Sequence, residues 1–329
     1  MERFGSTILF GKYELCRLLG RGRSGTVYLV KHKELEEYRA IKQVSKSCVD
    51  YGQFRKEALI LKGIRHPGIP VVYDLEEDED FCYLIEEFLE GDSLYALVSD
   101  IGHFSTAMTV RYGIQICHLV NILHSATPTP ILYLDLQPKN LLVCSGTVKL
   151  VDFDHAIHLD EAEYLTKRYG TVGCAAPEQY TGAVLDERTD IYAIGAVLYY
   201  MLTGEFPEKV PVFPRERMDR HWTRLIRTCL KENPAERYES ADRLVKELEY
   251  IQKQMEKKEK GVFRESPESS LTIAIAGAFP GAGTTHVAIG FAAYLWRRGL
   301  AVLYEEKNGS EAVRQMAGCE GYSMDSVGI

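Results

Sequence analysis

Short apolar runs separated by glycines and charged residues fill the first part of the chain. Runs of about four to eight such residues, bounded by turn-forming residues, are typical of β-strands. They predict strands at residues 15–19, 27–30, 40–44, 71–75 and 81–88. Before the fourth of these, residues 50–64 place apolar side chains at helical spacing among charged ones and predict a helix.

After Gly91 the pattern becomes helical. Apolar positions recur every three or four residues, as in the stripe of Leu244, Leu248, Ile251 and Met255. Helices are predicted at residues 94–98, 110–124, 191–202, 222–230 and 241–255. The chain therefore predicts an α+β fold. An N-terminal extension covers residues 1–12, a β-rich lobe residues 13–90 and a mainly helical lobe residues 91–255.

A charged segment with Ser and Pro, residues 256–270, is predicted to be a linker. Beyond it, a strand at 271–276, a helix at 285–297 and a strand at 300–304 predict a small βαβ segment within residues 271–329.

Composition narrows the class of protein. Of the 329 residues, 46% are hydrophobic and 26% charged, as in ordinary soluble globular proteins. A net charge of −8 without a long basic block disfavours a nucleic-acid partner. No apolar run reaches the roughly 18 residues of a membrane span, and the start lacks the pattern of a signal peptide. Eight scattered cysteines without a CxxC pair favour reduced thiols and a cytoplasmic location.

The sequence GRGRSGTV at residues 20–27 has the spacing GxGxxGxV. Three glycines at this spacing are a weak signal alone. In a dinucleotide-binding fold the motif leads into a helix, whereas here a β-run follows it. The glycines are therefore predicted at the tip of a hairpin, where backbone N–H groups can approach phosphate oxygens.

Lys42 lies in an apolar strand, and Glu57 lies on the helix that follows. An ion pair between them would hold the ammonium in place to bind phosphates. The alternative for Lys42 alone is a solvent-facing lysine on an edge strand.

Three polar residues follow in order. Asp135 and Asn140 are five positions apart, and Asp152 ends an apolar strand. Asn140 and Asp152 offer oxygen ligands for Mg²⁺, which leaves Asp135 to accept a hydroxyl proton. Each residue alone is better explained as a turn or capping residue, but the ordered set favours the catalytic interpretation.

Taken in order, these motifs resemble eukaryotic-type protein kinases, especially the bacterial serine/threonine kinases. The resemblance extends from Tyr13 to about Met255. It includes His66-Pro67, the substrate-binding segment GTVGCAAPEQ at residues 170–179 and the bracing helix at 190–195. Arg237 matches the arginine that in this family pairs with the glutamate of the APE motif, here Glu178.

The resemblance implies a bilobal protein kinase fold that transfers the γ-phosphoryl group of ATP, with Mg²⁺ or Mn²⁺, to a protein Ser or Thr hydroxyl. It implies catalytic roles for Asp135, Lys42, Glu57, Asn140, Asp152 and Gln137, with Asn140 and Asp152 as metal ligands. It implies nucleotide contacts from Leu19, Gly20, Arg21, Gly22, Arg23, Ser24, Gly25, Val27, Ala40, Lys42, Glu86, Glu87, Phe88, Leu89 and Leu142.

Four residues depart from the family pattern. Leu134 replaces the arginine that gathers a phosphorylated activation loop, so activity is expected not to depend on such a phosphate. Gln137 replaces a lysine that neutralises the γ-phosphate. Asp154 replaces a flexible glycine and places an extra carboxylate near the metal; the alternative is that Asp154 is a solvent-facing loop residue. Glu86 aligns with the usually apolar gatekeeper position behind adenine, and Lys42 is its expected partner.

These departures keep a second hypothesis open, a nucleotide-binding pseudokinase scaffold. The survival of Lys42, Glu57, Asp135, Asn140 and Asp152 favours an active enzyme. A metabolic small-molecule kinase is disfavoured because such relatives generally lack the APE-type segment.

The segment AGAFPGAGTTH at residues 276–286 follows a predicted strand and opens a predicted helix. It resembles the P-loop of partitioning and septum-site ATPases, although Thr284 replaces the lysine. The alternative is a small strand–turn–helix appendage. A half-domain of this kind would expose an apolar face, which predicts self-association or docking on the kinase lobe.

Overall fold

The computed structural model describes residues 7–22, 25–47, 51–164, 170–208, 211–214 and 218–262, with Ala288, Gly290, Phe291 and Tyr294. The chain divides into two compact units, Met1–Lys260 and Gly261–Ile329. The fold below is that of the first unit.

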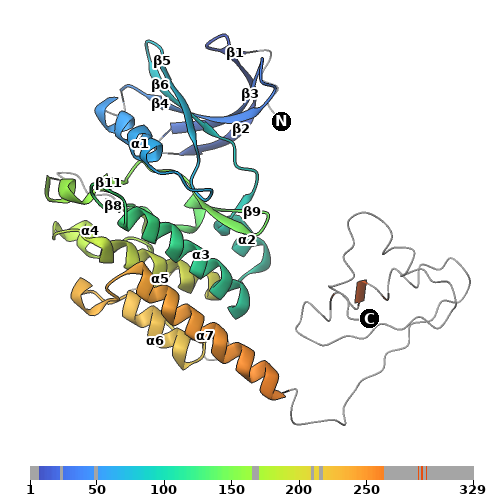
Figure 1. Ribbon diagram of the computed structural model, residues 1–329, viewed down its shortest axis with the longest axis vertical. Coiled ribbons are helices and arrows are strands. Elements are labelled where there is room, and N and C mark those ends of the chain that lie inside the picture. The colour runs from blue at the N-terminus through green and yellow to red at the C-terminus, as the bar shows by residue number, and fades with distance from the viewer. Residues whose placement is uncertain are drawn as a thin grey trace, which may run out of the picture. The chain divides into compact units, whose positions relative to one another are not determined.

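The N-terminal part of this unit is a six-stranded antiparallel sheet with the order β1-β2-β3-β4-β6-β5. Figure 1 shows this sheet with helix α1 beside it. The elements are β1 (Ile8–Leu9), β2 (Tyr13–Gly22), β3 (Gly25–His32), β4 (Tyr38–Ser45), α1 (Tyr51–Gly63), β5 (Val72–Glu77) and β6 (Phe81–Glu87). All five predicted strands and the predicted helix of this lobe are confirmed.

Alternation along the central strands gives the sheet two buried faces. Tyr13, Val30, Ile41, Tyr83 and Ile85 form a small cluster on one face. The intervening residues face the other side, where the cluster that contains Val44, Leu84 and residues of α1 continues into the core of the helical lobe. Because side chains point to opposite faces with a period of two, Ala40 and Lys42 also lie on this second face.

The C-terminal part is helical and is built around α3 and α5 (Figure 1). Its helices are α2 (Leu94–Ile101), α3 (Thr106–His124), α4 (Glu178–Thr181), α5 (Glu187–Thr203), α6 (Arg220–Cys229) and α7 (Ala241–Val262). Ser93, Ser105, Asp186 and Asp219 each cap a helix N-terminus by accepting a backbone N–H bond. The predicted helices are confirmed.

Short strands and 3₁₀ turns complete this unit, and most of them lie between α3 and α5. They are β7 (Asp92–Ser93), β8 (Ile131–Leu132), β9 (Leu141–Cys144), β10 (Thr147–Leu150), β11 (Ile157–His158), and the turns η1 (Pro138–Asn140), η2 (Leu159–Tyr164) and η3 (Pro234–Glu236). They form a three-stranded sheet, β10-β9-β7, and a two-stranded pair, β11-β8.

Helix α7 continues to Val262, so residues 256–262 of the predicted linker are helical. Lys and Glu in this run are good helix formers, and polarity alone does not end a helix. Most of the predicted βαβ segment lies outside the described residues, although Ala288, Gly290, Phe291 and Tyr294 are helical, as predicted for residues 285–297.

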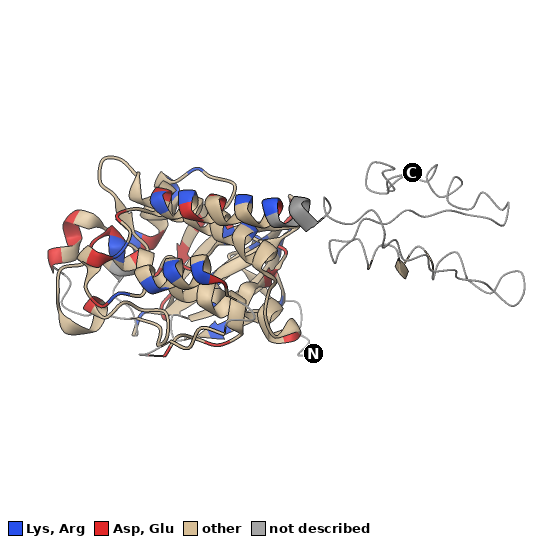
Figure 2. Ribbon diagram, turned by 90° about the horizontal axis from the view of Figure 1, so that it is seen from below, with Lys and Arg blue, Asp and Glu red and all other residues tan. Residues whose placement is uncertain are grey.

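Figure 2 shows basic and acidic residues interspersed along the helices of this unit. On α7, Asp242 pairs with Lys246 and Arg243 with Glu247, each four residues apart. The six cysteines within the described residues carry free thiols. Among the same residues, no helix combines the length and the apolar character needed to cross a bilayer.

Candidate active site

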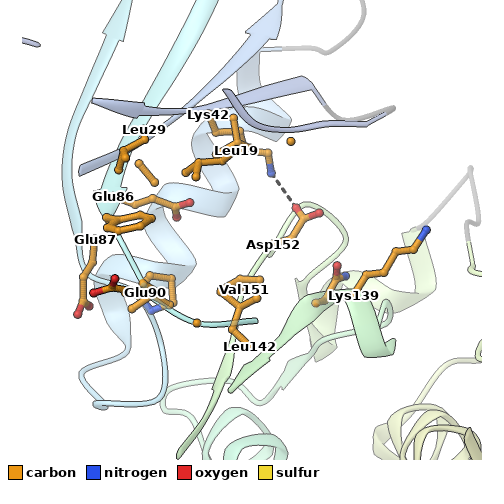
Figure 3. Close-up of a pocket in the computed structure, with 18 of the residues that line it drawn as sticks. Leu19, Leu29, Lys42, Glu86, Glu87, Glu90, Lys139, Leu142, Val151 and Asp152 are labelled. Carbon is orange, nitrogen blue, oxygen red and sulfur yellow. Dashed lines mark hydrogen bonds and ion pairs between the residues drawn. The ribbon is translucent and has the colours of Figure 1, made fainter. Parts of the chain in front are cut away.

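A cavity of about 1080 Å³ lies between the strands of the N-terminal sheet and the segment from η1 to Asp152 (Figure 3). Every described residue to which we assigned a nucleotide contact lines it. These are Leu19, Gly20, Arg21, Gly22, Gly25, Val27, Ala40, Lys42, Glu86, Glu87, Phe88, Leu89 and Leu142. The other two, Arg23 and Ser24, lie outside the described residues.

The glycine-rich sequence forms the β2–β3 hairpin, as predicted, with Gly22 paired to Gly25 at its end. Gly25 has φ +142°, and a Cβ there would lie 2.3 Å from the backbone oxygen of Gln43 on β4. Only glycine fits this position. The hairpin therefore lies close against β4 and presents backbone rather than side chains to the cavity.

Lys42 binds three carboxylates at once. Its Nζ lies 3.0 Å and 3.2 Å from the two oxygens of Glu57 and 2.8 Å from Asp152 Oδ1, and it also donates to Asp154 Oδ1. The dashed line in Figure 3 marks the bond to Asp152. The side chains of Lys42 and Glu57 are buried, which excludes the solvent-facing alternative.

The charges of this group are strongly coupled. Burial lowers the pKa of Lys42, but the carboxylates of Glu57, Asp152 and Asp154 together raise it well above its usual value. Burial also raises the pKa of Glu57 and of Asp152, against the effect of the Lys42 ammonium. Because one cation faces three acids, a carboxylate of the group holds a proton more readily than it would in water.

Asp152 has a left-handed backbone, φ +63°, and its position is fixed from both sides. The Tyr133 hydroxyl donates to the backbone oxygens of Val151 and Asp152, the latter at 3.0 Å. The backbone N–H of Phe153 donates to Glu57 Oε1 at 3.3 Å. These bonds hold the Asp152 side chain toward the cavity that Asn140 also lines.

Asp135 accepts hydrogen bonds at both carboxylate oxygens. Thr171 Oγ1 donates to Oδ1 at 2.7 Å, while Gln137 Nε2 at 2.8 Å and Asn140 Nδ2 at 3.0 Å donate to Oδ2. Asn140 also donates to the backbone oxygen of Asp135. Three predicted site residues are thus linked directly, and Thr171 joins them.

The loop before Asp135 is held by Asp190 at the start of α5. Asp190 accepts bonds from the backbone N–H groups of Tyr133 at 2.9 Å and Leu134 at 2.8 Å, and its Oδ2 also lies 2.9 Å from His124 Nε2. Leu134 has φ +65°, an unfavourable conformation for a leucine that such bonds offset. The predicted brace is confirmed.

Arg237 and Glu178 form a buried bidentate ion pair, as expected. Arg237 Nη2 lies 2.8 Å from Glu178 Oε2, and Nη1 binds Oε1. The same guanidinium donates to the backbone oxygens of Arg188, Lys231 and Glu232. The pair fixes α4 and the segment before it to the helical lobe.

The expected pairing of Glu86 with Lys42 is wrong. The Lys42 ammonium is taken by Glu57, Asp152 and Asp154, and no hydrogen bond to the Glu86 carboxylate occurs among the described residues. Burial raises the pKa of Glu86 to about 7, while Lys42 acts in the opposite direction at longer range.

Comparison with known proteins identifies the family. A family model described as protein kinase domain matches residues 13–248. The chain belongs to the protein kinase domain family. The matched range covers the β-rich and helical lobes described above and ends before the C-terminal segment.

Several kinases are similar to this chain. Serine/threonine-protein kinase PrkC of Bacillus subtilis is 31% identical over 207 residues, which are 60% of this chain and 31% of PrkC. Serine/threonine-protein kinase PknB of Mycobacterium leprae is 27% identical over 300 residues, 82% of this chain and 48% of PknB. An Aurora kinase of Eremothecium gossypii is 28% identical over 223 residues, 66% and 59% of the two chains. This chain thus spans less than two thirds of each relative.

Sequence reasoning missed three contacts in the kinase domain. The bond from Thr171 to Asp135 brings together residues 36 positions apart and has no local signal. The bond from Tyr133 to the backbone of Asp152 depends on a hydroxyl whose target lies on another segment. The contact of Asp154 with Lys42 had one signal, the replacement of glycine by a carboxylate near a lysine.

Proposed function

We propose that this chain transfers the γ-phosphoryl group of ATP to a Ser or Thr hydroxyl of a protein. The observation that carries the proposal is the hydrogen-bonded set of Asp135, Asn140 and Thr171 beside a cavity that also holds Lys42 and Asp152. The serine/threonine kinases among the relatives support the choice of acceptor, as does the segment at residues 170–179.

The cavity supplies one group for each part of the nucleotide. The β2–β3 hairpin presents backbone N–H groups to the phosphates, and Val27 and Ala40 flank the base. Lys42, held by Glu57, binds the α- and β-phosphates through its ammonium. The phosphates reach this ammonium by displacing one of the carboxylates that now surround it.

The donors present fit a magnesium ion. Asn140 and Asp152 offer amide and carboxylate oxygens on one side of the cavity, and oxygen ligands are those that Mg²⁺ or Mn²⁺ prefers. When bound, the ion neutralises negative charge on the phosphate oxygens. We therefore assign these two residues as its protein ligands.

Asp135 orients the acceptor hydroxyl and takes its proton as the new P–O bond forms, while the bond from the γ-phosphorus to the β,γ-bridging oxygen breaks and ADP leaves. Three donors hold its carboxylate in one orientation, so the acceptor does not have to reorganise it. Gln137 contributes a neutral N–H where the family has a lysine. Losing one charge-assisted contact slows transfer by about 10–1000-fold relative to a lysine-containing kinase.

We further propose that activity does not require a phosphate on the activation segment. Leu134 is buried in a cluster with Leu132, Ala162 and Leu185, and Ile157 and Leu159 pack against it. This apolar contact joins the catalytic loop to η2, where the family uses an arginine and a phosphate. A side chain of Leu offers nothing for a phosphate to bind.

Radiolabelled transfer with phosphoamino-acid analysis tests the activity. The protein is incubated with Mg-ATP and casein, and labelled residues are separated after hydrolysis. We expect phosphoserine and phosphothreonine on casein or on the chain itself. Label on tyrosine alone would contradict the assigned acceptor.

Two observations favour a second function, a pseudokinase scaffold that binds nucleotide without transferring phosphate. Asp154 binds the Lys42 ammonium that should bind phosphates, and Gln137 lacks the positive charge of the lysine that the family has at this position. Nucleotide binding with equally absent transfer in the wild type and in Asp135→Asn would support the scaffold.

We also propose that residues 271–329 form a P-loop-like module through which the chain associates with a second copy in the cytoplasm. Phe291 and Tyr294 are 37% and 51% exposed, and their rings stack with centroids 6.3 Å apart. Light scattering should show a dimer that the double variant Phe291→Ser/Tyr294→Ser dissociates. A monomeric wild type at micromolar concentration would contradict the proposal.

A further inference from the structure

Glu86 places a carboxylate in the apolar part of the cavity. It lies on β6 directly opposite Ala40 on β4, and the two side chains share a face of the sheet. Figure 3 shows the Glu86 side chain entering the cavity, with Leu29 on one side of it and Val151 and Leu142 on the other.

The neighbouring glutamate is different. Glu87 Oε2 accepts a hydrogen bond from the backbone N–H of Val71 at 3.3 Å, and Oε1 lies 3.8 Å from Lys149 Nζ. Within the described part of the chain, the Glu86 carboxylate makes no hydrogen bond, so its hydrogen-bonding capacity is directed into the cavity. Burying such a group without a partner is unfavourable, and a ligand can supply that partner.

The position of Glu86 in the cavity identifies the part of a nucleotide that it would contact. Lys42, which binds phosphates in the proposed function, is two residues from Ala40 on the same strand and the same face. Ala40 and Leu142 both line the cavity, and in the proposed function a nucleotide with its phosphates at Lys42 places its flat base between them. The edge of that base then faces Glu86.

We propose that Glu86 selects the base of the nucleotide by accepting a hydrogen bond from an exocyclic amino group, and so favours 6-aminopurine over 6-oxopurine nucleotides. The inference rests on the proposed function for the position of the phosphates. It assigns the role to the carboxylate of Glu86, at a position where the family usually has an apolar residue.

The chemistry of the two purines supports this choice. Adenine carries an amino donor at position 6, which pairs with a carboxylate oxygen, whereas guanine carries an oxygen acceptor there. Two acceptors facing each other in a partly dehydrated cavity repel.

Burial raises the pKa of Glu86 to about 7, Lys42 lowers it, and Asp152, Asp154 and Glu87 add to the rise. The discrimination against guanine should therefore be greater at pH 8, where Glu86 is ionised, than at pH 6.

Competition binding tests the proposal without relying on catalysis. Dissociation constants are measured in Mg²⁺ for ATP, GTP and purine riboside triphosphate, which lacks any group at position 6. The proteins are the full wild-type chain, Glu86→Gln and Glu86→Leu. Glu79→Gln, which removes the same charge from an exposed turn between β5 and β6, is the control.

At pH 8 the wild type and the control should bind ATP about tenfold more tightly than either analogue, the effect of one hydrogen bond to a charged group. Glu86→Leu should bring ATP and purine riboside triphosphate to within about threefold of each other. Glu86→Gln, whose amide can also donate to an oxo group, should bring ATP and GTP equally close.

Unchanged ratios in both Glu86 variants would overturn the inference, even if one of them unfolds more easily than the other. Failure of any nucleotide to bind the wild type would overturn the inference together with the proposed function. A wild type that shows the base preference but transfers no phosphate would leave base selection intact and remove only the transfer activity.

Discussion

Lys42 Nζ lies 2.8 Å from Asp152 Oδ1, and the same ammonium binds Glu57 and Asp154. A lysine has three N–H donors, and these carboxylates account for them. The arrangement ties the sheet, α1 and the segment after β10 together. It also means that a phosphate must compete with a carboxylate for the cation.

Asp154 is the partner whose removal should favour nucleotide binding. In Asp154→Asn the Lys42 ammonium loses one competing charge while the side chain keeps its size. We expect the dissociation constant of Mg-ATP to fall by about three- to tenfold, corresponding to about 1 kcal/mol. Isothermal titration calorimetry measures it, with Asp160→Asn, an exposed residue in η2, as the control. Weaker binding in Asp154→Asn would show that Asp154 helps to hold the metal–nucleotide complex.

The Arg237–Glu178 pair should contribute strongly to stability. Replacing Arg237 by Met leaves the Glu178 carboxylate buried without its counter-charge, which costs about 3–5 kcal/mol. Urea denaturation measures the free energy of unfolding. The control is Arg243→Gln, which breaks an exposed pair with Glu247 and should cost less than about 1 kcal/mol. Equal costs for the two variants would contradict this account.

Thr171, which contacts Asp135, and Thr166, which lies outside the described residues, should respond differently to replacement by alanine. Thr171→Ala removes the hydroxyl that donates to Asp135 and should lower kcat by about 10–100-fold, whereas Thr171→Ser should retain most of it. Thr166→Ala should leave activity unchanged, because Leu134 cannot bind a phosphate on the activation segment. Steady-state kinetics with Mg-ATP decides this. If Thr166→Ala were inactive and chemical phosphorylation at that position restored activity, phosphate-independent activity would be refuted.

Glu86 should make stability depend on pH. Its pKa is about 7 in the folded chain and near 4.5 in the unfolded chain. Between these values the folded state holds a proton that the unfolded state lacks, so stability falls as the pH rises from about 4.5 to about 7. Glu86→Gln removes this effect. The free energy of unfolding of Glu86→Gln relative to wild type should therefore rise by on the order of 2 kcal/mol between pH 5 and pH 8. Urea denaturation at pH 5 and at pH 8 measures the difference in unfolding free energy between the two proteins. The charged groups that face Glu86 are the same in both: Lys42, Asp152, Asp154 and Glu87. The same difference at both pH values would contradict it.

The elements of the fold were predictable because each depends on local patterning. The short apolar runs that contain Val30 and Ile41 indicated strands, and the stripe from Leu244 to Met255 indicated α7. The end of α7 was not predictable, because a run of Lys and Glu suits both a helix and a linker.

The site was predictable where a family motif fixes both residue type and spacing, as for Lys42, Glu57 and Asp135. The motif could not show how neighbours share hydrogen bonds. Whether Lys42 binds Glu86 or Asp154 depends on where two distant segments meet, and a strand register places Glu86 beside Ala40 instead. Contacts of this kind follow from tertiary packing rather than from local sequence.

In the proposed function, the residues around Asp135 transfer phosphate. The most direct measurement is the rate of transfer of labelled phosphate from Mg-ATP to casein or to the chain itself, for wild type and for Asp135→Asn, with nucleotide affinity measured in parallel. We predict that Asp135→Asn binds ATP within about threefold of wild type but transfers phosphate at least about 100-fold more slowly. Equal rates in the two proteins, with nucleotide bound in both, would contradict the account.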